Sequence, residues 1–284
     1  MKAQPHLIGI IGHYISHTLS PAIHTAAFSA LDIPFSYGVF DVAPEFLAPL
    51  IVSMRKNRCA GANVTIPHKQ AVIPLLDDVQ DDATALGAVN TIVNRNGKLI
   101  GYNTDMPGIK HALASSGERL RNSSVLILGA GGGARAAVYA ISKFFFPRSV
   151  LVYNRSADHA EKMTSDFKKI FPKIIYATVA SPERLTRAID ESTLVVNTTS
   201  VGMTPNVDAL PVPGTITFSN QQIIFDIVYN PVETALLRLA RRRGAKTITG
   251  IEMFLSQAGY SFELWTGKTF PADIAREVAL RALT

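Results

Sequence analysis

The sequence predicts an α/β protein built from two domains. The chain has 284 residues, which is long for one small domain and suits two of ordinary size. Strand-type and helix-type segments alternate along most of it, a pattern typical of helices packed on parallel sheets. Near the middle, the apolar run 125–128 enters a glycine turn at 129–133, and a helix-forming stretch follows.

The first hundred residues contain the elements of one α/β domain. We expect strands at 7–11, 35–40 and 62–65, and helices at 20–31, 45–56 and about 77–87. Ser20 is placed to cap the first helix, and Pro21 to occupy its first position. The runs 89–94 and 98–102 flank Asn96-Gly97, and Asn-Gly between apolar runs is the strongest short hairpin signal.

The helix expected at 106–115 leads into the second domain. There we expect strands at 125–128, 149–153, 173–177, 193–197 and 223–228, with helices between them and a last helix at 236–243 that Gly244 ends. The remaining segments, 250–267 and 271–283, are predicted to be helical and to pack back on the first domain, closing a cleft between the two. The predicted domains are therefore 1–105 plus 249–284, and 106–248.

The glycine turn has the pattern of a dinucleotide site. Gly129 permits the tight turn after the strand, Gly131 lets the backbone approach a pyrophosphate, and Ala134 still allows close helix packing. The pyrophosphate would rest on the amides at the positive end of the following helix. The second domain is therefore predicted to be a Rossmann-type nucleotide-binding domain with a parallel sheet.

The end of the next strand indicates which dinucleotide binds. An NAD site usually ends this strand with Asp or Glu, which binds the ribose 2′-hydroxyl. Here Asn154 and Arg155 offer an amide and a fixed cation suited to a 2′-phosphate, and Ser156 adds a hydroxyl. The sequence therefore favours NADP over NAD.

Composition points to a small-molecule enzyme of the cytoplasm. No apolar run reaches the roughly 18 to 20 residues that span a bilayer, and residues 1–6 are too short and polar for a signal region. The net charge of +6 would help to attract anionic small molecules. Apart from Arg241-Arg242-Arg243, which complements a helix end, the basic residues are dispersed, so we expect no nucleic-acid partner.

Cysteine and histidine usage gives no sign of a disulfide or a metal site. The single cysteine, Cys59, enters an apolar stretch, and a buried inert thiol is the expected interpretation. The seven histidines show neither zinc-type spacing nor nearby cysteines, so no metal is expected.

Two residues of the first domain are candidates for proton chemistry. Lys69 stands just after a predicted strand end, where open α/β sheets place ligand-contacting residues, and an enzyme that reduces a ketone needs such a proton source. Asp105 begins the bridging helix and could orient the ammonium group. Taken alone, each has a plain alternative: a surface lysine and an aspartate that caps a helix.

Short motifs along nearly the whole chain carry a family resemblance. They occupy residues 17–21 (His-Thr-Leu-Ser-Pro), 61–69 (Gly-Ala-Asn-Val-Thr-Ile-Pro-His-Lys), 87–91, 101–105 (Gly-Tyr-Asn-Thr-Asp), 129–132, 154–156, 197–203, 226–231 (Asp-Ile-Val-Tyr-Asn-Pro) and 250–257. In this order and spacing they closely resemble the shikimate dehydrogenases. The resemblance implies that NADPH delivers a hydride to the C3 ketone of 3-dehydroshikimate, giving shikimate for aromatic amino-acid biosynthesis.

The resemblance also implies roles for individual residues. Lys69 and Asp105 match the catalytic pair, with Lys69 protonating the ketone oxygen and Asp105 holding its ammonium group. The substrate contacts carried over are Thr18 and Ser20, which bind the carboxylate, and Asn63, Thr65, Asn90, Asp105, Tyr229 and Gln257. The cofactor contacts are Gly129, Ala130, Gly131, Gly132, Gly133, Asn154, Arg155, Ser156, Thr199, Ile227 and Gly250.

Structural interpretations remain open for several of these residues. Asn63 and Asn90 could satisfy backbone groups at strand ends, Tyr229 could be a core aromatic, and Ile227 could face the core. Gln257 lies on an apolar helix, where a buried amide needs a partner. No role is assigned to Glu252. The only partner expected is the small-molecule substrate, and the chain is expected to be a monomer or a homodimer.

Two departures from the family pattern keep a related function open. The family most often has Ser-x-Ser where this chain has Thr18-Leu19-Ser20, and Asp158-His159 stand where NADP-specific members often carry a second basic residue. The first alternative is therefore a quinate/shikimate dehydrogenase that uses NAD.

Two other functions fit less well. Methylenetetrahydrofolate dehydrogenases share the two-domain layout and a cleft lysine, but the contexts of Asn90, Asp105 and Gln257 disfavour them. A non-catalytic nucleotide-sensing module predicts damage at Lys69 or Asp105, and both residues are intact.

Overall fold

The computed structural model describes residues 6–16, 18–55 and 59–283. The chain divides into two compact units: unit 1 comprises Met1–Thr104 and Leu255–Thr284, and unit 2 comprises Asp105–Phe254. The predicted domain limits differ from these units at Asp105 and at residues 249–254. None of the helices in the described ranges is long and apolar enough to cross a membrane.

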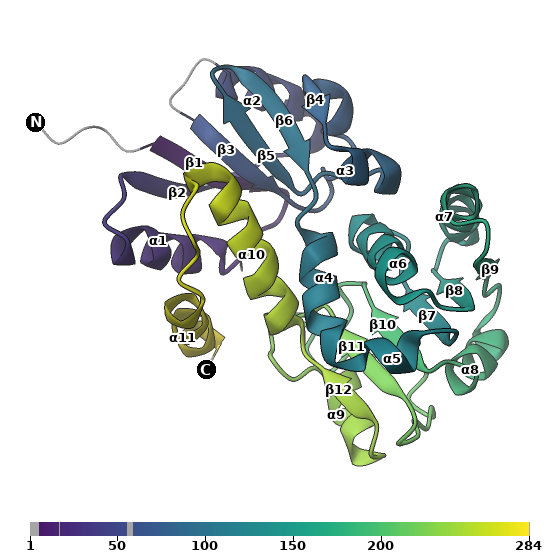
Figure 1. Ribbon diagram of the computed structural model, residues 1–284. Helices are drawn as coiled ribbons and strands as arrows, with labels where there is room; N and C mark the ends of the chain where they lie inside the picture. The colour runs from purple at the N-terminus through teal and green to yellow at the C-terminus, as the bar shows by residue number, and fades with distance from the viewer. Residues whose placement is uncertain (1–5, 17, 56–58, 284) are drawn as a thin grey trace, which may run out of the picture. The chain divides into compact units, whose positions relative to one another are not determined.

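Unit 1 is built on a mixed sheet of six strands (Figure 1). Its strands are β1 (His6–Gly12), β2 (Phe35–Asp41), β3 (Cys59–Val64), β4 (Asp78–Val79), β5 (Thr91–Arg95) and β6 (Lys98–Tyr102), in the order β2-β1-β3-β5-β6-β4. Strand β1 pairs in parallel with β2 and β3, whereas β5 runs antiparallel to both β3 and β6. The sheet of unit 1 is therefore mixed, and its antiparallel pairs include the hairpin predicted from the sequence.

The hairpin itself is confirmed. Asn96 and Gly97 have φ values of 54° and 91°, the left-handed conformation that this dipeptide favours. The Gly97 amide donates to Asn94 Oδ1 at 2.7 Å, which closes the turn.

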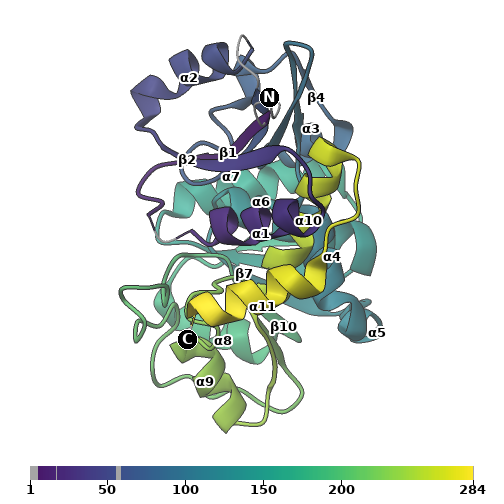
Figure 2. The same ribbon diagram turned by 90° about the vertical axis from the view of Figure 1, so that its left-hand side faces the viewer.

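The helices of unit 1 begin and end close to the predicted limits, with two corrections. They are α1 (Ser20–Ala30), η1 (Pro44–Phe46), α2 (Leu47–Met54), η2 (Ile73–Leu75), α3 (Asp81–Leu86) and α11 (Ala272–Leu283). The helix expected at 45–56 begins as a 3-10 turn, α2 ends at Met54, and Lys56 lies outside the described residues. The helix expected at 77–87 is shortened by β4. The C-terminal helix α11 packs against α1, as predicted (Figure 2).

Unit 2 contains a second six-stranded sheet that is entirely parallel. Its strands are β7 (Ser124–Leu128), β8 (Ser149–Tyr153), β9 (Ile175–Thr178), β10 (Leu194–Asn197), β11 (Ile223–Asp226) and β12 (Lys246–Ile248), in the order β12-β11-β10-β7-β8-β9. Counted from β7, this is the 3-2-1-4-5-6 order of the Rossmann fold, which confirms that prediction. The three-residue β12 was not predicted, because it is too short to show a periodic pattern.

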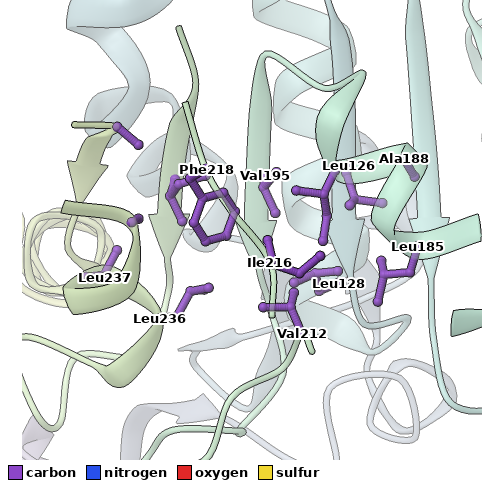
Figure 3. Close-up of a cluster of buried hydrophobic side chains, with 14 of the residues drawn as sticks. Leu126, Leu128, Leu185, Ala188, Val195, Val212, Ile216, Phe218, Leu236 and Leu237 are labelled. Atoms are coloured by element: carbon purple, nitrogen blue, oxygen red, sulfur yellow. The ribbon is translucent and has the colours of Figure 1, made fainter. Parts of the chain in front are cut away.

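Unit 2 also contains helices, some of which contact its sheet directly. They are α4 (Asp105–Leu113), η3 (Ala114–Ser116), α5 (Gly117–Leu120), α6 (Gly132–Phe145), α7 (Ala157–Ile170), α8 (Pro182–Asp190), α9 (Ala235–Arg242) and α10 (Gly250–Thr266), the last of which runs on into unit 1. Among them, α6, α7 and α9 contact the sheet directly. Figure 3 shows one core of the unit, in which Leu126 and Val195 of the strands lie among residues of α8 and α9 such as Leu185 and Leu236. Ligands of such sheets bind at the carboxyl ends of the strands, near the switch between β7 and β10.

Candidate active site

In unit 1, the polar residues predicted to contact substrate gather where several strands end. Strand β3 finishes at Val64, and β6 finishes at Tyr102. Because β5 is antiparallel to both, its first residue, Thr91, lies opposite Asn63 on one side and opposite Tyr102 on the other. The sheet therefore brings together residues that are far apart in the sequence.

The loop that carries Lys69 is held by backbone hydrogen bonds. The Thr65 amide donates to the Ile11 carbonyl at 2.8 Å, and the Val89 amide donates to the Lys69 carbonyl at 2.8 Å. Next to Lys69, the buried ring of His68 is hydrogen-bonded through Nε2 to the Val42 carbonyl at 2.7 Å. Lys69 is half-buried, and these bonds fix its backbone beside Asn90.

Asn63 and Asn90 are both buried and hydrogen-bonded. The Tyr37 hydroxyl donates to Asn63 Oδ1 at 2.7 Å, and Asn63 Nδ2 donates to the Asn90 carbonyl at 3.4 Å. The Thr104 amide donates to Asn90 Oδ1 at 2.7 Å. Both side chains therefore satisfy backbone groups at strand ends, which is the structural role that the sequence allowed.

The predicted helix cap at Ser20 is wrong. Ser20 is the first residue of α1 and lies inside the helix. The residue at the cap position is Leu19, whose side chain makes no capping hydrogen bond. Instead, the Ser20 amide donates to Thr18 Oγ1 at 3.3 Å, and the Thr18 hydroxyl donates to Ser20 Oγ at 3.3 Å. The two hydroxyls thus lie side by side, as a carboxylate site would need. His17, at the start of this motif, lies outside the described residues.

The remaining candidate substrate residues belong to both units. Gln257 is half-buried on α10 within unit 1. Asp105 is the first residue of α4 in unit 2 and is buried, with 5% of its surface exposed. Tyr229, also in unit 2, is half-buried, and its ring stacks on Phe254 with centroids 4.2 Å apart. Glu252 is half-buried on the first turn of α10.

In unit 2, the glycine turn joins β7 to α6. Gly129 has φ +111°, and a Cβ added there would lie 2.6 Å from Thr198 Oγ1. Gly131, which precedes α6, is exposed, and a Cβ added there would meet nothing within 4 Å. Ala134 is fully buried. The turn is therefore tight behind Gly129 and open at the amide end of α6, which is the shape that a pyrophosphate group requires.

The residues after β8 fit a phosphate-bearing ribose. Asn154 Nδ2 donates to the Ser156 carbonyl at 2.9 Å, which holds the loop, and Arg155 between them is exposed. Asp158 and His159 are also exposed, on the first turn of α7. A guanidinium at this place can bind a 2′-phosphate with two parallel hydrogen bonds.

Thr199 is positioned by a buried network that was not predicted. Its hydroxyl donates to Asn197 Oδ1 at 2.7 Å, and Asn197 Nδ2 donates to Asp226 Oδ1 at 2.9 Å. Asp226 has no exposed surface and also accepts from the Val228 amide and the Thr234 hydroxyl. An aspartate directly after the apolar residues 223–225 was the available signal for this network.

Burial raises the pKa of the Asp226 carboxyl from 3.8 to about 6, against the opposing effect of its three hydrogen bonds. Between these values the folded state holds a proton that the unfolded state has released, so stability falls as the pH rises. We expect Asp226→Asn to remove this effect. The stability of the unchanged protein relative to this variant should fall by about 2 kcal/mol between pH 4 and pH 7, as measured by urea unfolding.

Asp208→Asn is the matched control for that measurement, because the Asp208 side chain is 91% exposed. It should leave the pH profile of stability unchanged. If Asp226→Asn leaves the profile unchanged as well, Asp226 does not titrate with the raised pKa.

Ile227 borders the nucleotide turn, and Gly250 packs closely against the backbone of Ile227. A Cβ on Gly133 would lie 3.1 Å from Ile227 Cδ1, so this side chain borders the turn. A Cβ on Gly250 would lie 2.4 Å from the Ile227 carbonyl oxygen. Glycine at position 250 therefore lets the start of α10 touch the backbone after β11.

The described residues show no group of three or more histidine, cysteine or acidic side chains that could hold a metal ion.

Cys59 is buried, and its burial raises the pKa of the thiol, so the thiol stays protonated at neutral pH. This agrees with the inert cysteine predicted from the sequence.

Comparisons with known proteins identify relatives over the whole chain. Residues 10–92 match the shikimate dehydrogenase substrate binding domain, and residues 250–280 match the shikimate 5'-dehydrogenase C-terminal domain. The shikimate dehydrogenase (NADP(+)) of Symbiobacterium thermophilum is 41% identical over 98% of this chain and 94% of its own.

Solved structures agree with the sequence relatives. The shikimate 5-dehydrogenase of Thermus thermophilus, in complex with NADP(H) and shikimate, is 34% identical with a TM-score of 0.84, covering 98% of this chain and 99% of its own. The quinate dehydrogenase of Corynebacterium glutamicum, in complex with NAD, is 30% identical with a TM-score of 0.86 and the same coverage of 98% and 99%.

Proposed function

The chain belongs to the shikimate dehydrogenase family, and from this premise we propose that it reduces 3-dehydroshikimate to shikimate with NADPH, reversibly. The reaction is a step of the shikimate pathway, which leads to chorismate and the aromatic amino acids. One observation carries the proposal: the open glycine turn of unit 2 is followed by Asn154-Arg155, while unit 1 holds Lys69 beside a buried set of amides and hydroxyls. Each unit thus carries residues suited to one half of a ketone reductase site.

NADPH, when bound, supplies the hydride that reduces the C3 ketone. Gly129, Ala130, Gly131, Gly132 and Gly133 would receive its pyrophosphate, and Asn154, Arg155 and Ser156 its 2′-phosphate ribose. Thr199, Ile227 and Gly250 would line the nicotinamide end. These residues fit the group, because the turn is open at Gly131 and Arg155 is exposed.

The protein's own part of the chemistry is orientation and proton donation. We assign the proton to Lys69 Nζ, which donates to the ketone oxygen as the hydride arrives, with Asp105 as the carboxylate partner of the ammonium group. Thr18 and Ser20 would bind the substrate carboxylate through their adjacent hydroxyls. Thr65, Asn63, Asn90, Tyr229 and Gln257 would bind the ring hydroxyls. The cytoplasmic location and the monomer or homodimer state stay predictions from the sequence.

The second candidate is a quinate/shikimate dehydrogenase that uses NAD. Thr18 favours it, because its methyl group stands where the family most often has serine, and the similarity to a quinate dehydrogenase supports it. Arg155 opposes it, since a cation there suits the 2′-phosphate of NADP. Initial rates with shikimate and quinate, each with NADP and NAD, separate the two functions. Rapid shikimate oxidation with NADP alone supports the first, and quinate turnover or a preference for NAD supports the second.

The same assay tests Arg155. We expect Arg155→Gln to raise the KM for NADP by roughly 10- to 100-fold, since a hydrogen bond to a charged group contributes about 1.5–3 kcal/mol. The KM for NAD, which has no 2′-phosphate, should stay unchanged. Arg242→Gln, at an exposed position on α9, is the control. An equal rise in the KM for NADP and the KM for NAD would show that Arg155 does not bind the 2′-phosphate.

A further inference from the structure

One face of α10 carries three side chains with polar groups within unit 1. Gln257, Ser261 and Trp265 follow one another at intervals of four residues, so they share a face of the helix. The Trp265 indole N–H donates to the Ile92 carbonyl at 2.9 Å. A Cβ on Gly61 would lie 2.4 Å from that indole nitrogen, so glycine at this position lets the ring reach the sheet.

Ser261, in the middle of this face, is the centre of a buried group of hydroxyls. Its Oγ lies 2.8 Å from Thr91 Oγ1, 3.0 Å from Thr104 Oγ1 and 3.1 Å from Asn63 Nδ2. Ser261 and Thr91 have no exposed surface, and Thr104 is 3% exposed. The helix is therefore joined to the ends of β3, β5 and β6 by one side chain.

Backbone groups fix the direction of these hydrogen bonds. The Asn90 carbonyl can only accept, so Asn63 must turn its amide nitrogen toward it and its Oδ1 toward the Tyr37 hydroxyl. The Thr104 amide can only donate, so Asn90 must turn its Oδ1 toward it. The hydroxyls of Thr91 and Thr104 donate to the same Asn90 Oδ1 at 3.0 Å and 3.2 Å. A path of hydrogen bonds thus runs from Tyr37 through Asn63, Asn90, Thr91 and Thr104 to Ser261.

The Tyr37 end of the path is also held in place. Its ring stacks on the buried ring of His24, with centroids 4.7 Å apart and planes 4° apart. Phe262 and Trp265 of α10 lie against the same histidine. The helix that carries Ser261 thus also supports the hydroxyl at the far end of the network.

We propose that Ser261 is a positioning residue for substrate: it holds the side chains of Asn63 and Thr91 against α10, the helix that carries Gln257 one turn away on the same face. This inference rests on the proposed function, in which the amides of Asn63 and Gln257 bind the ring hydroxyls. A substrate with several hydroxyls needs donors and acceptors in a set order, and the Ser261 network supplies that order. Without its hydroxyl, Asn63 Nδ2, Thr91 and Thr104 each lose a hydrogen-bond partner.

The test is Ser261→Ala with separate kinetics for each ligand. We expect the KM for shikimate to rise between about 5-fold and 100-fold, because buried polar groups lose a partner, while the KM for NADP stays within twofold. Ser29→Ala, the same substitution at an exposed position of α1, should change neither. An unchanged KM for shikimate, or an equal rise in both constants, would overturn the proposal.

A second variant guards against loss of folding in the first. Thr91→Val keeps the shape of the side chain and removes its hydroxyl, so it breaks the same path and should give the same selective rise. Calorimetric titration of each folded variant with shikimate and with NADP reports binding without turnover. If the unchanged protein does not turn over shikimate, the proposed function fails; if it does and both variants bind shikimate normally, only the role of Ser261 fails.

Discussion

Replacing Lys69 with alanine is expected to lower kcat for shikimate oxidation by about 10²- to 10⁴-fold, the usual contribution of a positioned general acid or base. The KM for shikimate should change by no more than a few fold, because the proton moves only as the transition state forms. The backbone bonds at Thr65 and Val89 do not involve the lysine side chain, so the loop should keep its structure.

Steady-state rates and a binding titration check this result together. Lys268→Ala, at an exposed position of unit 1, is the matched control and should leave both constants unchanged. A small primary amine added to the Lys69→Ala protein should restore part of the rate by accepting the proton that leaves the C3 hydroxyl during oxidation. A large loss of shikimate binding at normal kcat would instead make Lys69 a binding residue.

Gly250→Ala is expected to have the second largest effect. Its Cβ would lie 2.4 Å from the Ile227 carbonyl oxygen and 2.6 Å from that of Val228, and backbone atoms cannot move aside as a flexible side chain can. We expect a loss of about 3 kcal/mol of stability, the upper range for overpacking. We also expect weaker NADP binding, since Ile227 borders the glycine turn at Gly133.

Urea unfolding and NADP titration measure the two consequences. Gly214→Ala is the control, because a Cβ there would come no closer than 3.9 Å to Leu210 Cδ1. It should be neutral in both measurements. Normal stability and normal NADP affinity in Gly250→Ala would mean that α10 starts farther from β11 than the structure has it.

Local signals explain what could be predicted from the sequence. The apolar runs with a glycine turn specified the Rossmann unit, and Asn96-Gly97 specified the hairpin, because these patterns act over a few neighbouring residues. Strands β4 and β12 were missed, since two or three residues carry no period. The Ser20 cap was mispredicted because helical backbone already includes Ser20, and Thr18 takes up its amide.

The buried networks could not be predicted in the same way. Ser261 and Asn63 are 198 positions apart in the chain, and Asn197 and Asp226 are 29 apart. A serine on an apolar helix has no local feature that reveals its partners, which only the folded sheet brings close. The network around Asp226 could have been predicted in part, because a carboxylate at the end of an apolar strand needs hydrogen-bond donors around it.

The division of the chain has a consequence for synthesis. Unit 2 is one continuous stretch, Asp105–Phe254, whereas unit 1 needs Leu255–Thr284 in addition to its first 104 residues. During synthesis on the ribosome, unit 2 is therefore complete before unit 1, although unit 2 begins later in the sequence. Until Ser261 and Trp265 emerge, the Thr91 hydroxyl and the Ile92 carbonyl lack the hydrogen bonds that these two residues make with them. The sheet of unit 1 therefore gains these hydrogen bonds only after α10, near the end of the chain, has been synthesised.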